Sequence, residues 1–122
     1  MEAGGQERNS TAERMAFLRA LQSLDRALEE NIDRAHRMKR RIDELEEACA
    51  DGRPIKKIVP DEKTPVLVQL LTESAEALQE HGSRVRRTEA RTLHAEGLTM
   101  EQIARLFGVT RQRVSALLRE YN

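Results

Sequence analysis

Apolar residues follow a seven-residue repeat through the first half of the chain, between Arg14 and Cys49, where neither glycine nor proline occurs. A repeat sustained over about five heptads is typical of a coiled coil. A helix of this length, on the order of 50 Å at about 1.5 Å per residue, cannot bury its apolar stripe alone. One position of the predicted seam holds Phe17, Leu24, Asn31, Met38 and Leu45, and the other holds Leu21, Leu28, Ala35, Ile42 and Cys49.

We expect these seam residues to pair two copies of the chain as a homodimer. The alternative is an intramolecular hairpin, in which the long helix folds back on the helix predicted at residues 65–81. Asn31 would weaken the seam but could fix its register, as buried polar seam residues do. The flanking charges do not decide between a parallel and an antiparallel arrangement. The pattern therefore predicts a helical seam and leaves its partner open.

A break follows the long helix. Gly52 should end it, because glycine enters the left-handed conformation of a helix C-terminus without strain, and Pro54 comes two residues later. Residues 52–64 contain two prolines and predict an extended linker or docking segment. Within it we expect Ile58 and Val59 to pack against other apolar side chains.

Two helices are predicted next. Thr64 can cap the first, with Pro65 at its first helical position, and Gly82 should stop it. Ser83 should cap the second, which Gly97 closes. The apolar face of the first holds Leu67, Leu70, Leu71, Ala75 and Leu78, and that of the second holds Val85, Ala90 and Leu93.

The stretch from Thr99 to Arg119 predicts two short helices joined by a tight turn. Thr99 and Gln102 have the spacing of a capping box. Gly108 should adopt the left-handed conformation of the turn, and Thr110 should cap the second helix. The positions expected to face inward are Ile103, Ala104, Phe107, Val114, Leu117 and Leu118, with Val109 filling the corner.

The outward face of the second helix is polar and basic. An α-helix fits the major groove of DNA, where arginine pairs with guanine and glutamine with adenine. We expect Arg111, Gln112 and Ser115 to reach bases, and the helix N-terminus to suit a backbone phosphate. The residues predicted to contact DNA are Thr110, Arg111, Gln112, Arg113, Ser115, Ala116 and Arg119.

These residues carry a resemblance. The segment LTMEQIARLFGVTRQRV is similar to the helix-turn-helix of bacterial transcription regulators, in particular to region four of sigma factors and to the DNA-binding tail of resolvases. The resemblance covers residues 83–122. It implies a bacterial, cytoplasmic, nucleoid-associated protein that binds double-stranded DNA and regulates transcription. The alternatives are a module that docks on RNA polymerase, a sigma factor or an anti-sigma factor, and a mobile-element protein that organises DNA.

Charge is distributed in a way that supports nucleic-acid binding. The chain has 21 basic and 21 acidic residues, yet residues 82–122 hold 8 arginines against 4 glutamates, while residues 1–81 hold 13 basic and 17 acidic residues. The basic cluster of Arg37, Lys39, Arg40 and Arg41 is either a second DNA contact or a solvated face paired along its helix.

Other chemistry finds little support. His36, His81, His94 and Cys49 lack the spacing of zinc ligands, and no phosphate-binding loop or nucleophile motif occurs. We expect no enzyme activity, no cofactor and no metal. The single cysteine, Cys49, fits a reducing compartment, and no apolar run is long enough to span a membrane.

The predicted fold class is all-α. Ser10 or Thr11 should cap the long helix, because the residues before them show no apolar pattern. The expected order is a disordered lead (1–10), a coiled-coil dimerisation helix (11–51), a linker (52–64), and a helical DNA-binding domain (65–122) with its helix-turn-helix at residues 99–119.

Overall fold

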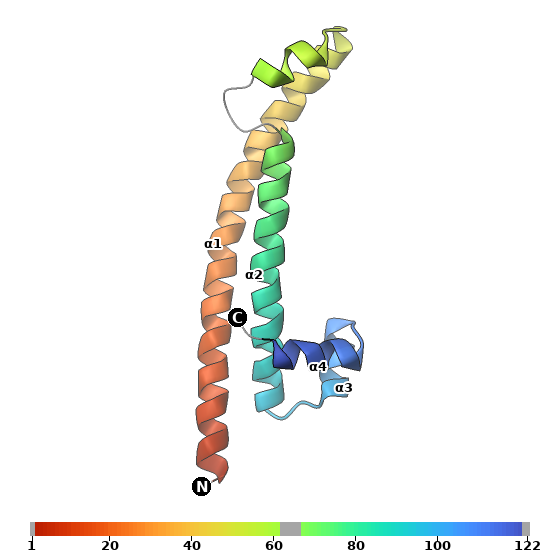
Figure 1. Ribbon diagram of the computed structural model, residues 1–122. Helices are drawn as coiled ribbons and strands as arrows, with labels where there is room; N and C mark the ends of the chain where they lie inside the picture. The colour runs from red at the N-terminus through yellow and green to blue at the C-terminus, as the bar shows by residue number, and fades with distance from the viewer. Residues whose placement is uncertain (1, 62–66, 121–122) are drawn as a thin grey trace. The chain divides into compact units, whose positions relative to one another are not determined.

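The computed structural model describes residues 2–61 and 67–120, and within these ranges the chain is helical and contains no strand. The predicted all-α class, with a long N-terminal helix and a C-terminal helix-turn-helix, is confirmed. Within the described ranges, no helix contains an apolar stretch of the length that a membrane span needs. The elements are α1 (Glu2–Ala50), η1 (Ile55–Lys57), η2 (Val59–Asp61), α2 (Leu67–Ala95), α3 (Met100–Phe107) and α4 (Arg111–Arg119) (Figure 1).

The chain divides into two compact units. The helix-turn-helix unit comprises Met1–Asp25 and Glu80–Asn122, and the hairpin unit comprises Arg26–Gln79. Both long helices contribute to both units, because each unit pairs one part of α1 with one part of α2. This division differs from the linear order of domains expected from the sequence.

The start of α1 differs from the prediction. The helix begins at Glu2, so Ser10 and Thr11 lie inside it and do not cap it, and residues 2–10 are helical. Helix propagation adds one hydrogen bond per residue once a helix exists, and this segment contains several good helix formers. The other end agrees with the prediction, because Gly52 has a φ of 69° and the Arg53 N–H donates to the Ala48 carbonyl at 2.9 Å.

The prediction of two helices separated at Gly82 is wrong. α2 runs unbroken from Leu67 to Ala95, and Gly82 is not among the glycines with positive φ. A glycine in a helix interior costs up to about 1 kcal/mol, which burial of neighbouring turns can offset. Ser83 is therefore not a cap, whereas Gly97, with a φ of 108°, ends the helix as expected. The predicted cap at residues 64–65 lies outside the described residues.

The segment after α1 is also more regular than predicted. Instead of an extended linker, it forms the short 3-10 helices η1 and η2. Pro54 precedes η1 in an extended conformation, and the Ile58 N–H donates to the Ile55 carbonyl at 3.0 Å. Ile58 and Val59 are half-buried, which agrees with the expectation that they pack.

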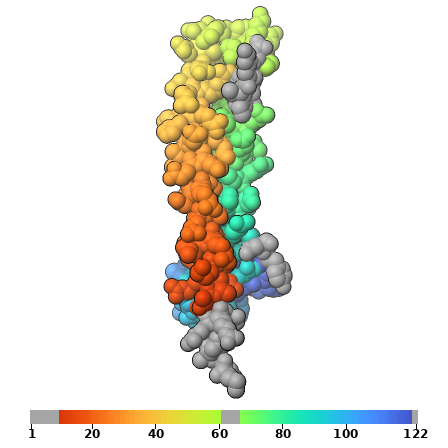
Figure 2. Space-filling model, turned by 90° about the vertical axis from the view of Figure 1, so that its left-hand side faces the viewer, coloured from red at the N-terminus to blue at the C-terminus, as the bar shows by residue number. Residues whose placement is uncertain are grey.

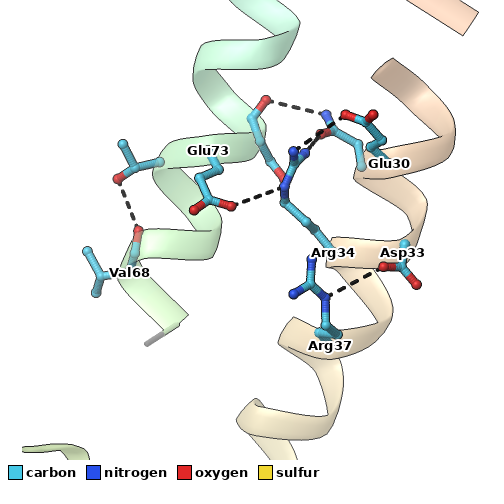
Figure 3. A network of polar contacts seen from close by, with 9 residues as sticks. Glu30, Asp33, Arg34, Arg37, Val68 and Glu73 are labelled. Atoms are coloured by element: carbon cyan, nitrogen blue, oxygen red, sulfur yellow. Dashed lines mark hydrogen bonds and ion pairs between the residues drawn. The ribbon is translucent and has the colours of Figure 1, made fainter. Parts of the chain in front are cut away.

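In the hairpin unit, α1 packs against α2 of the same chain. The Asn31 amide Nδ2 donates to the Ser74 carbonyl at 3.3 Å, and the Arg34 guanidinium Nε lies 3.3 Å from a Glu73 carboxylate oxygen (Figure 3). Figure 2 shows the side chains of the two helices lying against each other in this unit. Within the hairpin unit, the structure shows the intramolecular hairpin that the sequence left open, and the seam asparagine is satisfied by it.

The seam of α1 is only half as predicted. The positions of Phe17, Leu24, Asn31, Met38 and Leu45 are turned inward and partly buried. The second predicted position is wrong, because Leu21, Leu28 and Ile42 are 38–41% exposed and Ala35 and Cys49 are exposed as well. The residue one position earlier in the chain faces inward in place of each of these. Most of these earlier residues are alanines, whose small side chains allow two helices to approach closely. The inward residues at this position are Ala20, Ala27, Arg34, Arg41 and Ala48.

Threonines complete the seam in the helix-turn-helix unit. Thr88 and Thr92 on α2 are 0% and 7% exposed. The Thr92 hydroxyl lies 2.8 Å from the Thr88 carbonyl and 3.1 Å from the Glu13 carbonyl of α1, and both oxygens can accept from it. A buried hydroxyl needs such a partner, and this one ties α1 to α2. The sequence pattern did not identify it.

Ion pairs also form along α1 in the hairpin unit. Arg37 pairs with Asp33 at 3.7 Å and Arg41 with Glu44 at 2.6 Å, each along α1. These contacts agree with a face of charges paired along the helix.

The unbroken α2 leads to a stability prediction. Gly82→Ala should raise the free energy of unfolding by about 0.5–1 kcal/mol, because alanine restricts the unfolded chain and favours the helix. The added Cβ would lie 3.6 Å from the flexible Arg86 Nη2, an ordinary contact. Urea unfolding followed by circular dichroism measures the change.

Gly97→Ala is the matched control. It should destabilise by about 1 kcal/mol, because its backbone φ of 108° disfavours a side chain. If Gly82→Ala destabilised the protein to the same extent, α2 would be interrupted at residue 82.

Candidate nucleic-acid interface

α3 begins at a capping box. The Gln102 N–H donates to the Thr99 hydroxyl oxygen at 3.1 Å, and the Thr99 N–H donates to the Gln102 side-chain oxygen at 2.8 Å. These two bonds satisfy two of the backbone donors that a helix start leaves unpaired. The predicted capping box is confirmed, and it fixes where α3 begins.

A three-residue turn connects α3 to α4. Gly108 has a φ of 66° and a ψ of 34°, and the Val109 N–H donates to the Ala104 carbonyl at 3.0 Å. Thr110 then caps α4, because its hydroxyl accepts from the Arg113 N–H at 3.1 Å. The left-handed glycine and the second cap are both as predicted, and together they set the direction in which α4 leaves the turn.

A small core holds α3 and α4 against the end of α2. Ile103 and Val114 are fully buried, and Leu117 is 1% exposed. Val109, predicted to fill the corner, is 39% exposed, because the turn carries it to the outside of the crossing. The other residues of this core are Ala90 and Ala104, with Leu93, Leu98, Met100, Phe107 and Leu118 packed around them.

The residues predicted to contact DNA lie on α4 and its cap, and most are exposed. Thr110, Arg111 and Gln112 stand together at the start of the helix. Ser115 and Ala116 are half-buried, so they present only part of their surface to a ligand. Arg113 and Arg119 are exposed further along. The fold thus gathers this set on one short helix, whose buried side is occupied by Val114 and Leu117.

Two acidic residues, which the sequence analysis missed, pair with arginines of this surface. Arg111 Nε lies 3.2 Å from Glu101 Oε1, and both side chains are more than half exposed. Arg113 Nη1 lies 3.3 Å from Glu120 Oε1, and Arg87 Nη1 lies 3.8 Å from Glu120 Oε2. The Arg111 and Arg113 side chains are 63% and 49% exposed, and exposed pairs of this kind are weak and exchange readily with other anions. The Arg87 side chain is only 16% exposed. No sequence spacing signals the pair between α3 and α4, because it depends on how the two helices cross.

The described residues include no group of three or more histidine, cysteine, aspartate or glutamate side chains that could hold a metal ion. Cys49, expected to pack in the seam, is exposed.

Comparison with known proteins agrees with this geometry. A family model described as a Homeodomain-like domain matches residues 81–122, which include the end of α2 together with α3 and α4. No curated protein and no solved structure matches the chain. The matched domain supports a helix-turn-helix DNA-binding motif in this part of the chain.

The cap of α4 leads to a second stability prediction. Thr110→Ala should lower the free energy of unfolding by about 1 kcal/mol, because the Arg113 N–H loses its acceptor. Thr72→Ala is the control, since the exposed Thr72 hydroxyl donates to the Val68 carbonyl, four residues earlier within α2. That change should stay within about 0.5 kcal/mol. Equal losses in the two variants, measured by urea unfolding, would argue against the cap.

Proposed function

We propose that the chain binds double-stranded DNA sequence-specifically as a homodimer and regulates transcription in a bacterium. The observation that carries the proposal is the exposed stripe of Arg111 and Gln112 at the capped start of α4. In the major groove, guanine and adenine present hydrogen-bond acceptors, and these side chains carry donors that match them. As a binding protein, the chain would need neither cofactor nor catalytic group.

The mechanism follows from the position of each group. α4 enters the major groove with its first turn, where Arg111 and Gln112 reach base edges and Ser115 lies one turn on. Arg113 and Arg119 neutralise phosphates, and the unpaired backbone N–H groups at the start of α4 suit another phosphate. Affinity should fall steeply with salt, because each neutralised phosphate releases counterions.

Glu101 competes with DNA for the Arg111 side chain. In the free protein its carboxylate pairs with Arg111 at 3.2 Å. Binding of guanine requires Arg111 to exchange this carboxylate for the O6 and N7 acceptors of the base. The same carboxylate repels phosphates when no suitable base is offered. We therefore assign Glu101 a role in tuning affinity: it weakens binding to any duplex, and most to the correct site, where Arg111 must leave it to reach guanine.

A second candidate function is docking on RNA polymerase, a sigma factor or an anti-sigma factor. The observation in its favour is a hollow of about 400 Å³ beside the outer face of α3, lined by Leu98, Gln102, Arg105 and Leu106. Leu106 is 66% exposed there, and exposed apolar side chains mark protein interfaces. The α4 stripe has no such residue, so the two functions would use different helices.

Arg111→Ala tests the assigned recognition surface. Affinity for a site selected from a random duplex library should fall about tenfold to a hundredfold, because a bidentate arginine–guanine contact contributes about 1–3 kcal/mol. The preference at one base pair of each half-site should relax. Arg53→Ala removes the same charge from the hairpin unit and should change affinity by less than about twofold. Unchanged affinity and preference in Arg111→Ala would rule out this surface.

Glu101→Gln tests the competition. Affinity for the selected site should rise about two- to fivefold, as an exposed ion pair allows, while affinity for unspecific duplex DNA rises less. Fluorescence anisotropy with both duplexes at matched salt gives the ratio. An equal rise for both duplexes would show that Glu101 affects only overall charge.

A further inference from the structure

The two helices of the hairpin unit carry more large apolar side chains outside than inside. In the described part of this unit, the buried hydrophobic residues are Ala27, Ala48 and Leu70. A unit of this size with so small a core buries too little apolar surface to be stable by itself. The exposed large hydrophobic side chains on α1 and α2 of this unit are between 38% and 67% exposed; they are Leu28, Ile32, Ile42, Val68, Leu71 and Leu78.

One flank of the hairpin is polar. Arg34 reaches both Glu30 on α1, at 3.8 Å, and Glu73 on α2, at 3.3 Å (Figure 3). Each glutamate precedes a seam residue, Asn31 on α1 and Ser74 on α2. In an antiparallel pair, the positions that precede the seam on both helices lie along the same flank, and this flank is held by ion pairs.

The other flank is apolar. Here lie the positions that follow a seam residue, with Leu28 after Ala27 on α1 and Leu71 after Leu70 on α2. On α1, Leu28, Ile32 and Ala35 are four and three residues apart, and Ile42 follows two turns after Ala35. On α2, Val68, Leu71, Ala75 and Leu78 alternate three and four residues apart. Such spacing keeps each set on one helical stripe. The two stripes form a single apolar face, which we call the hairpin face.

We propose that the hairpin face binds the hairpin face of a second copy of this chain, antiparallel, to form a four-helix bundle with a two-fold axis beside Ile32 and Glu73. The residue spacing on both helices is symmetric about this axis. On α2, Leu71 and Ala75 are each two residues from Glu73, and Val68 and Leu78 are each five away. An antiparallel copy therefore sets Leu71 on Ala75 and Val68 on Leu78.

α1 has the same symmetry at the same level. Leu28 and Ala35 lie on either side of Ile32, and Leu21 and Ile42 lie about ten residues before and after it. The hydrogen bond from Asn31 to Ser74 places Ile32 level with Glu73. One axis thus serves both helices, which an isologous interface requires.

Charge selects the antiparallel direction. Asp25 and Lys39 interrupt the apolar stripe of α1 seven residues before and after Ile32. In an antiparallel dimer, Asp25 of each copy faces Lys39 of the other. In a parallel two-fold dimer, α1 of each copy would face α2 of the other, and Asp25 and Lys39 would not meet.

The inference rests on the dimer of the proposed function and names its surface. It requires no DNA, so its test uses the protein alone. At micromolar concentration, sedimentation equilibrium of the full chain should give twice the 14.0 kDa of one chain. Ile32→Glu should raise the dimer dissociation constant by about a hundredfold or more, because it places two carboxylates at the axis. Arg40→Glu, which also introduces a carboxylate but at an exposed α1 position off the stripe, should leave the dimer intact.

A charge exchange keeps the test decisive if Ile32→Glu fails to fold. Lys39→Asp alone should weaken the dimer about tenfold, because two carboxylates then face each other. Adding Asp25→Lys should restore the original dissociation constant within about threefold. Absence of restoration would overturn the antiparallel register.

The outcomes separate this inference from DNA binding. A monomer, or a dimer that survives Ile32→Glu, would overturn the hairpin face while leaving DNA recognition open to its own assay. A dimer with the expected responses that selects no sequence would support the face and contradict the proposed function. An Ile32→Glu monomer that binds single half-sites without preference for paired ones would support both.

Discussion

Burial of Ile103, Val114 and Leu117 against Ala90 of α2 is the packing on which the helix-turn-helix depends. α3 and α4 have eight and nine residues, and helices this short are unstable in water on their own. Two threonine caps and one left-handed glycine fix where they begin and turn, and the core fixes how they cross. The polar stripe of α4 faces outward because the opposite side of the helix fills this core.

α2 extends this dependence beyond the helix-turn-helix. One unbroken helix supplies the platform for α3 and α4 in one unit and the partner of α1 in the other. Its contact with α1 uses small or polar groups, such as Ala27 against α2 and the hydroxyl of Thr92 against the Glu13 carbonyl. Because alanine and threonine occupy the contact, the larger apolar side chains are left on the outside. The small and polar residues at the helix contact therefore account for both the narrow intramolecular seam and the exposed apolar hairpin face.

Ion pairs involve different parts of each unit. The excess of arginine in residues 82–122 is partly neutralised by Glu101 and Glu120, which pair with Arg111 and Arg113. In the hairpin unit, Arg34 holds one flank together through Glu30 and Glu73. The Arg111 and Arg113 pairs are exposed and contribute little stability. The Arg34 side chain is only 15% exposed, so its pair with Glu73 is part of the contact between α1 and α2.

The sequence by itself determined the all-α class, the helix-turn-helix, its two caps and its glycine turn, because capping and left-handed glycine depend on residues within one turn of each other. Only the tertiary structure decided that Gly82 lies inside a helix, that the seam of α1 includes Ala27 in place of Leu28, and that Glu101 meets Arg111. A heptad stripe allows two adjacent seams, and a glycine can either end or continue a helix. Which of these occurs depends on the surface packed against it, and that surface comes from residues far away in the chain.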